Sequence, residues 1–166
     1  MEKEELVKLK ENLRKMREDQ VRRILGHVMS QDAEERQSFS AYQKEWQLVG
    51  EYLENATRLL EQEWEHPAQT EFEKKQQEKK FQCLQELCEQ LSSVQDQLDT
   101  MGELKQLSEQ TLLFSFLDFY TTKKEQLLAE ASYEEQIESL YEKMVQWKQI
   151  EEETQNEKKT DPKRRK

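Results

Sequence analysis

The side chains that most often carry out chemistry are few in this chain and poorly spaced for it. The two cysteines, Cys83 and Cys88, stand five residues apart, which places them about 140° apart around a helix. The two histidines, His27 and His66, are remote from both cysteines in the sequence. A zinc site needs converging ligands, and a cysteine nucleophile needs a nearby base. We therefore expect no metal site, no cofactor and no nucleophilic catalysis.

Other catalytic signatures fail in the same way. Glutamate and aspartate are so abundant that a pair of carboxylates distinguishes no particular site. The glycines at positions 26, 50 and 102 lie too far apart to build a phosphate-binding loop. Long helices with narrow apolar seams also offer no concave pocket of their own. The sequence therefore predicts a chain that is not an enzyme and takes no small-molecule substrate.

The composition predicts helices rather than sheets. Of the residues, 34% are hydrophobic and 37% are charged, against about 45–50% and 25% in typical soluble domains. Helix-forming Glu, Gln, Lys and Leu are abundant, whereas glycine (three) and proline (two) are rare. Regular apolar spacing argues against disorder. The predicted fold class is all-α, with long coiled-coil-type helices in a folded-back helical bundle or a heteromeric coiled coil.

The charge balance narrows the expected partners and compartment. A net charge of −10 repels phosphate backbones and anionic membranes, so a membrane is not expected and a nucleic acid is a disfavoured partner. The first residues are charged rather than apolar, so we expect no signal peptide and no secretion. No stretch has the length and apolar character of a membrane span. The predicted location is the cytoplasm (cytoskeleton) or the nucleus.

A heptad series is the clearest pattern of the first half. Apolar residues follow one another at alternating steps of three and four, which predicts one helix over 32–66. Its aromatic members are bulky for a two-stranded coil and favour a three- or four-helix bundle. Their acidic neighbours favour packing over the stacking of nucleic-acid bases. The series consists of Phe39, Tyr42, Trp46, Val49, Leu53, Ala56 and Leu60.

A separate seam predicts an amphipathic helix over 1–31. Joining it to the next apolar positions requires a step of five residues, which would interrupt a supercoil. Around 29–35 charged residues fall on the seam and Asp32 is a good helix N-cap, so this stretch is either a helix break or a loosened part of one long helix. The first seam is Leu6, Leu9, Leu13 and Met16, and the positions after the step are Val21, Leu25 and Val28.

Pro67 must end or kink a helix, and it opens a second heptad helix over 67–101. The seam of this helix loses its apolar residues just after Gly102. A glycine inside a helix also lowers the stability of the helix by about 1 kcal/mol relative to alanine. We therefore expect a hinge or turn at 99–103. The seam consists of Leu84, Leu87, Leu91, Val94, Leu98 and Met101.

The stretch 102–152 combines an unusually apolar segment with a last heptad helix. Residues 112–120 are apolar on nearly every side of a helix, so their burial needs several neighbouring helices or a groove on a partner. We expect the central interface here. The residues assigned to it are Leu113, Phe116, Leu117 and Tyr120, and the last seam is Tyr133, Ile137, Leu140, Met144 and Trp147.

The C-terminal tail, 153–166, is expected to be disordered and basic, since the chain from about residue 151 is rich in Glu, Gln, Asn and Lys. Its last four residues resemble a nuclear localisation sequence, with a solubilising tail as the alternative. These residues are Lys163, Arg164, Arg165 and Lys166.

Together these patterns predict a non-catalytic structural or interaction subunit of a larger assembly, of the cytoskeletal, centrosomal or chromosome-associated kind. Its seams are expected to pair with another helical protein or with a second copy of the chain. The helix around Trp46, followed after Pro67 by two seam helices, resembles spectrin-type three-helix repeats. That resemblance implies the alternative of a self-contained helical bundle acting as an adaptor. An alternative of another class is a nucleic-acid-associated protein that uses the basic tail.

Overall fold

The computed structural model describes residues 3–111 and 116–160, which fold into long helices joined by short turns. Within these ranges the chain forms five α-helices and no strand, so the predicted all-α class is confirmed. The helices are α1 (Lys3–Val28), α2 (Ala33–Ala41), α3 (Gln43–Glu65), α4 (Glu71–Thr111) and α5 (Phe116–Thr160).

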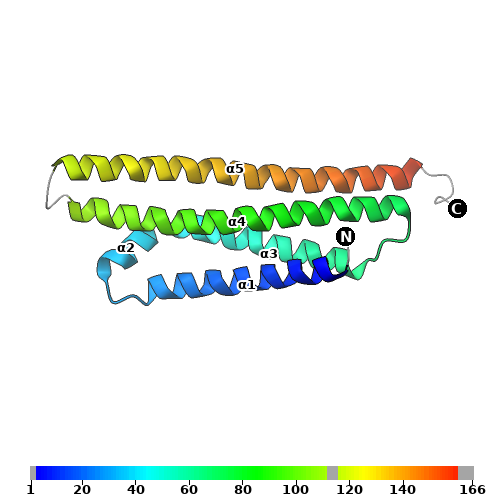
Figure 1. Cartoon of the computed structure of the whole chain (residues 1–166), viewed down its shortest axis with the longest axis horizontal. Helices are drawn as coiled ribbons and strands as arrows, with labels where there is room; N and C mark the ends of the chain where they lie inside the picture. The colour runs from blue at the N-terminus through cyan, green and yellow to red at the C-terminus, as the bar shows by residue number, and fades with distance from the viewer. Residues whose placement is uncertain (1–2, 112–115, 161–166) are drawn as a thin grey trace.

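The four long helices run alternately up and down in a folded-back bundle (Figure 1). In that view α5 forms one edge, α1 forms the opposite edge, and α3 and α4 lie between them. α4 is adjacent to each of the other four helices, and α5 packs along it for most of its length. No Cα atom of α1 comes within 8 Å of one in α5 among the described residues.

The heptad seams of the sequence form the core of this bundle. Their side chains join one continuous apolar cluster contributed by all five helices. Each fully buried Leu or Val stabilises the bundle by about 1.5–3 kcal/mol. The buried seam residues are Leu9, Leu13, Phe39, Tyr42, Trp46, Val49, Leu53, Ala56, Leu60, Leu84, Leu87, Leu91, Val94, Leu98, Met101, Tyr133, Leu140 and Trp147, with Leu6, Met16, Ile137 and Met144 partly buried.

The helix predicted over 32–66 is in fact two helices, because the chain leaves α-helical geometry at Tyr42. Tyr42 has φ −114° and ψ 21°, and its backbone N–H donates to the Phe39 carbonyl across 3.0 Å. The heptad spacing survives this kink, so the sequence pattern did not reveal it. The expected cap at Asp32 is present: its carboxylate accepts from the Glu34 backbone N–H at 3.0 Å.

The expected hinge at 99–103 is wrong, since α4 runs unbroken through Gly102. The weak helix propensity of glycine is offset by packing on both sides of it. Met101 is buried in the core, and Leu104 packs against the core. The amide of Gln106 further on donates to the Asp32 carboxylate at 3.1 Å, which ties this part of α4 to the cap of α2.

The expected register shift in α1 is also wrong. The seam begun by the leucines continues with the same heptad spacing, but through the polar residues Gln20, Arg23 and His27. Gln20 is buried and donates to the Trp46 carbonyl, while Arg23 and His27 reach carboxylates on neighbouring elements. The apolar Val21 and Leu25 are about half exposed instead.

The expectation of disorder from about residue 151 is wrong for the described part of the tail, because α5 continues as a helix to Thr160. The N-terminal part of α4 supports it: the Gln76 amide donates to the Ile150 carbonyl and to the Thr154 hydroxyl, each at 3.3 Å. The four basic residues assigned to nuclear localisation, at 163–166, lie outside the described residues.

Candidate protein-interaction site

The cysteines and histidines form no ligand cluster in the described residues, where no three His, Cys, Asp or Glu side chains are grouped to hold a metal ion. Cys83 and Cys88 are free thiols buried in the core. Burial raises the pKa of the Cys88 thiol to about 12 and also raises the pKa of Cys83. Both thiols therefore stay protonated at neutral pH. A cysteine acts as a nucleophile or metal ligand as the thiolate, so these two are not in the form that either role needs.

Four side chains of α4, spaced seven residues apart, donate hydrogen bonds to four backbone carbonyls of α5 that are also seven residues apart. Each carbonyl oxygen has a second lone pair beyond the one used inside its own helix. The repeat follows from the antiparallel packing, which presents the same face of each helix every two turns. The pairs are Gln76 to Ile150 (3.3 Å), Cys83 to Lys143 (3.2 Å), Gln90 to Gln136 (3.3 Å) and Gln97 to Ala129 (3.0 Å).

A buried polar cluster joins α5 to the kink between α2 and α3. The Tyr42 hydroxyl donates to the Glu130 carboxylate at 2.6 Å and accepts from the Gln126 amide at 3.0 Å. The Gln126 carbonyl in turn accepts from the Ser108 hydroxyl at 3.1 Å. Burial and the bond to Glu130 raise the pKa of Tyr42, so its hydroxyl remains a donor. The cluster is satisfied within the chain and positions α5 rather than offering a site.

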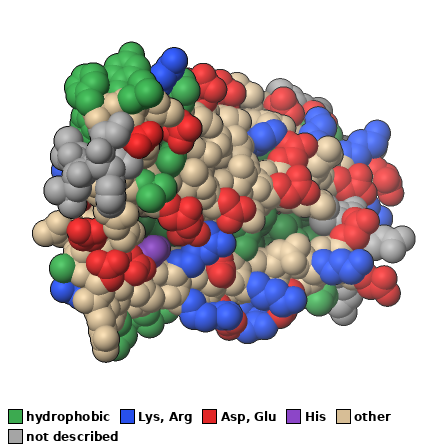
Figure 2. Space-filling view, turned by 60° about the vertical axis from the view of Figure 1, so that its left-hand side comes forward, with side chains coloured by type: hydrophobic (Ala, Val, Ile, Leu, Met, Phe, Trp, Pro, Cys, Tyr) green, Lys and Arg blue, Asp and Glu red, His purple; other side chains and the backbone are tan. Residues whose placement is uncertain are grey.

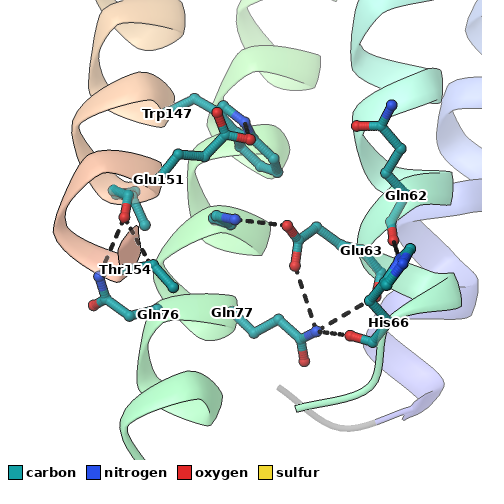
Figure 3. A network of polar contacts seen from close by, with 10 residues as sticks. Gln62, Glu63, His66, Gln76, Gln77, Trp147, Glu151 and Thr154 are labelled. Carbon is teal, nitrogen blue, oxygen red and sulfur yellow. Dashed lines mark hydrogen bonds and ion pairs between the residues drawn. The ribbon is translucent and has the colours of Figure 1, made fainter. Parts of the chain in front are cut away.

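A second polar network closes the other end of the bundle, where α3 turns into α4 (Figure 3). The Lys80 ammonium lies 2.6 Å from the Glu63 carboxylate and 5.2 Å from the centre of the Trp147 ring. The Gln77 amide donates to the His66 carbonyl at 3.0 Å, which holds the turn before Pro67 against α4. His66 is thereby used in the turn, and the buried Lys80 ammonium is neutralised by the Glu63 carboxylate.

His27 lies in a third polar cluster, where α1 ends. Its ring stacks on Phe39 with centroids 5.3 Å apart, and one ring nitrogen is 3.2 Å from the Glu35 carboxylate. Arg23 reaches Asp99 on α4 at 2.9 Å. These contacts replace the apolar seam that α1 lacks here, so His27 has a packing role.

Among the described residues, one group of exposed large apolar side chains lies on α5, and we call this surface the α5 face. It lies on the side of α5 opposite the buried Tyr133 and Leu140, and therefore away from α4. Figure 2 shows apolar side chains gathered over the start of α5, at the upper left of the view. Further along the same side the exposed residues include Glu134, Glu135 and Glu138, followed by Tyr141. The α5 face consists of Phe116, Leu117, Tyr120, Leu127 and Leu128, which are between 58% and 83% exposed.

A groove of about 730 Å³ runs along α1 beside α3 on the opposite edge of the bundle, and we call it the α1 groove. Val7 and Val21 supply apolar floor, and the alkyl stems of Lys10, Arg14 and Arg17 extend it. α1 carries eight basic and five acidic side chains, whereas α5 carries eleven acidic and six basic ones. Beyond the groove the exposed apolar row of α1 continues with Leu25 and Val28, and Met29 directly after α1 is exposed as well.

The structure separates the predicted interface residues into two groups. The seam residues from Phe39 to Leu98 and from Ile137 to Trp147 lie in or against the chain's own core, so they meet helices of the same chain. Of the apolar segment, Phe116, Leu117 and Tyr120 are exposed, and Leu113 lies outside the described residues.

Two features escaped the sequence reasoning. The first is the row of four hydrogen bonds from α4 to α5, which we call the hydrogen-bond ladder. Its signal in the sequence was hydrogen-bonding side chains at a seven-residue spacing, whereas the sequence prediction used only the spacing of apolar residues. The second is the α1 groove, which depends on which side of α1 faces α3. The sequence pattern predicts the wrong side, because it places Val21 on the buried seam. The sequence pattern that indicates the α1 groove is the row of Val7, Val21, Leu25 and Val28 on one face of the helix.

Comparison with protein-family models, curated proteins and solved structures finds no match, and therefore assigns no family or activity to the chain. Among the described residues, no helix combines the length and the apolar character needed to cross a membrane.

Proposed function

We propose that this chain is a non-catalytic interaction subunit: a self-contained helical bundle that binds another helical protein through the α5 face. The observation that carries the proposal is the exposure of five large apolar side chains within about three and a half turns of one helix. Isolated exposed apolar residues are ordinary, but a contiguous group of them is typical of a binding surface.

The heptad seams are buried inside the bundle, so we do not place the proposed interface on them. Pairing of Trp46 or Leu91 with a partner helix would require opening the bundle, because both side chains lie within the core. The α5 face needs no such opening. Its aromatic members, Phe116 and Tyr120, are of the residue types enriched at the centres of protein interfaces.

The setting that we propose is a larger protein assembly of the cytoskeleton, the centrosome or chromosomes. Support for this setting comes from the abundance of charged helix formers and the heptad periodicity, which are common in such subunits. The absence of a cofactor or substrate site is part of the same proposal, and the protonated thiols and internally paired polar clusters are consistent with it.

A photo-crosslinking amino acid placed at Leu128 tests the interface directly. Full-length chain carrying it should yield a discrete cross-linked protein in cells, while the same probe at exposed Gln85 on α4 should not. Replacing Phe116 and Leu117 together by Asp should remove the Leu128 product and leave the circular dichroism spectrum unchanged, since both side chains are exposed.

The matched control is Ser92→Asp with Ser93→Asp, which adds the same charge to an exposed part of α4. Equal cross-linking from Leu128 and Gln85, or a Leu128 product that survives the Phe116 and Leu117 substitutions, would show that the α5 face is not a binding surface.

A further inference from the structure

We propose that the α5 face binds a second copy of this chain, and that its receptor is the α1 groove of that copy. The inference rests on the proposed function, because it assigns a partner to the same face. The two surfaces lie on opposite edges of the bundle with α3 and α4 between them, so one molecule cannot join its own two surfaces (Figure 1).

The directions of the helices suit this contact. The C-terminal end of α1 and the N-terminal end of α5 lie at the same end of the bundle (Figure 1). Two copies placed side by side in the same orientation therefore bring α5 of one against α1 of the next, running antiparallel. In that arrangement the apolar start of α5 meets the apolar end of α1, around Leu25 and Val28.

One antiparallel register matches the two surfaces along about 30 Å. Val28 and Lys10 are 18 residues apart on α1, and Tyr120 and Glu138 are 18 residues apart on α5, which is about 27 Å on each helix. Every member of the register is exposed and lies on one side of its helix. The pairs are Val7 with Tyr141, Lys10 with Glu138, Arg14 with Glu134, Val21 with Leu127 and Val28 with Tyr120.

The charges of the groove favour this occupant. Four basic and three acidic side chains line it, but two of the acids, Glu11 and Glu18, are already paired with Arg14. Such exposed pairs along one helix contribute little, so Arg14 can exchange them for a carboxylate of the neighbouring copy. The acidic side chains beyond the α5 face are placed to supply it.

Two-fold pairing of like surfaces is less favourable. An antiparallel pair of α5 faces that matches Phe116 with Leu128 and Leu117 with Leu127 would bring Tyr120 of each copy against the charged Lys124 of the other. Two α1 surfaces would bring basic helices together. Pairing α1 with α5 instead places Lys10 opposite Glu138 and Arg14 opposite Glu134.

A contact between two different surfaces is not closed by two copies, and copies that keep the same orientation do not curve into a ring. Each copy keeps a free groove at one edge and a free α5 face at the other, so copies add successively into an open row. The mean molar mass of the full-length chain should therefore rise with concentration past that of a dimer, as measured by light scattering and sedimentation velocity.

Two single-surface variants separate this arrangement from the others. Variant A carries Val21→Asp and Leu25→Asp in the groove row, and variant B carries Tyr120→Asp and Leu127→Asp on the α5 face; all four side chains are exposed. Each variant alone should be monomeric. Mixed in equal amounts, they should form a 1:1 dimer and nothing larger, because A keeps its α5 face and B keeps its groove.

Charge reversal provides a second route that does not depend on the apolar substitutions. Arg14→Glu and Glu134→Arg should each weaken association about two- to fivefold, and an equal mixture of the two should restore it. Glu89→Arg, at an exposed position of α4, is the control and should have no effect.

The failures of the two proposals are distinguishable. A wild-type chain that stays monomeric at all concentrations overturns self-association, while a different protein cross-linked from Leu128 would leave the proposed function standing. Variant A associating alone while variant B does not would indicate two-fold pairing of α5 faces and would also overturn the head-to-tail arrangement.

Discussion

The side-chain amide of Gln20 on α1 donates a hydrogen bond to the Trp46 carbonyl on α3 across 3.0 Å. The bond is buried, and it is possible because Gly50, one turn further along α3, leaves room for the Gln20 side chain. A Cβ at position 50 would lie 3.1 Å from the Gln20 amide nitrogen. The close approach of α1 and α3 thus depends on a residue without a side chain.

Gly102→Ala and Gly50→Ala should have different effects on stability. A Cβ at Gly102 meets no atom within 4 Å, so alanine should raise the free energy of unfolding by about 0.5–1 kcal/mol through its helix propensity. At Gly50 the same gain should be offset by damage to the Gln20 hydrogen bond, which contributes about 0.5–1.5 kcal/mol. Urea denaturation of both variants checks this, and an equal gain at the two positions would contradict it.

Ala129→Leu should destabilise the chain by about 1–3 kcal/mol, because the small side chain lies buried where Gln97 of α4 reaches the carbonyl of residue 129. A larger side chain there pushes α4 and α5 apart. Ala131→Leu is the matched control on the exposed side of the same helix and should change stability by less than about 0.5 kcal/mol. Equal thermal unfolding midpoints for the two variants would argue against a close α4–α5 contact.

Lys80→Ala should cost about 1.5–3 kcal/mol in chemical denaturation, since it leaves the Glu63 carboxylate without its charged partner in a poorly hydrated place. The two side chains are only 10% and 18% exposed. Lys79→Ala is the neighbouring control: its contact to Glu153 is 3.9 Å long and exposed, so its loss should be nearly neutral. A loss of similar size from Lys79→Ala would show that the burial of Lys80 is unimportant.

Stability should fall as the pH rises above about 9, partly because of Cys88. Burial raises the pKa of this thiol from its ordinary value of 9.0 to about 12. The unfolded chain therefore releases the proton first, and the folded state loses about 1.4 kcal/mol per pH unit for this group between pH 9 and 12. Buried tyrosines whose pKa is also raised, Tyr42 and Tyr133, add to the slope above pH 10.

Cys88→Ala isolates the contribution of the thiol. Its unfolding free energy should decrease less between pH 8 and 10 than that of the wild type in buffers of equal ionic strength, although its value at pH 8 is lower because of the lost packing. The same slope in both proteins would mean that the Cys88 thiol is hydrated in the folded chain.

The sequence predicted the helical class, the end of a helix before Pro67 and most of the core, because these follow from local propensity and apolar periodicity. It failed where a polar residue occupies a buried position. Gln20, Arg23 and His27 continue the seam of α1, but their burial depends on acceptors supplied by other helices. A search for apolar residues alone shifted the register onto Val21, on the exposed side.

The candidate site was predicted only in part, for a related reason. Periodicity shows that Leu91 and Trp46 will be buried, but it does not show whether another chain or the same chain buries them. The apolar character of 112–120 did indicate a surface of interest. The exposure of Phe116, Leu117 and Tyr120 follows from the packing of α5, which among the described helices has its close backbone contacts with α4, and this is a property of the tertiary arrangement.

The hydrogen-bond ladder between α4 and α5 consists of similar side-chain-to-carbonyl hydrogen bonds at a regular spacing of seven residues. Such a ladder is compatible with more than one axial alignment of the two helices. Sliding α5 by seven residues would align Gln76 with the Lys143 carbonyl and re-form all but one rung. The polar contacts that do not repeat must therefore help to select the native alignment. They are Lys80 beneath Trp147, Glu86 with Lys143, and Tyr42 between Gln126 and Glu130. Loss of all three would leave two helices that stay paired but can occupy more than one axial position.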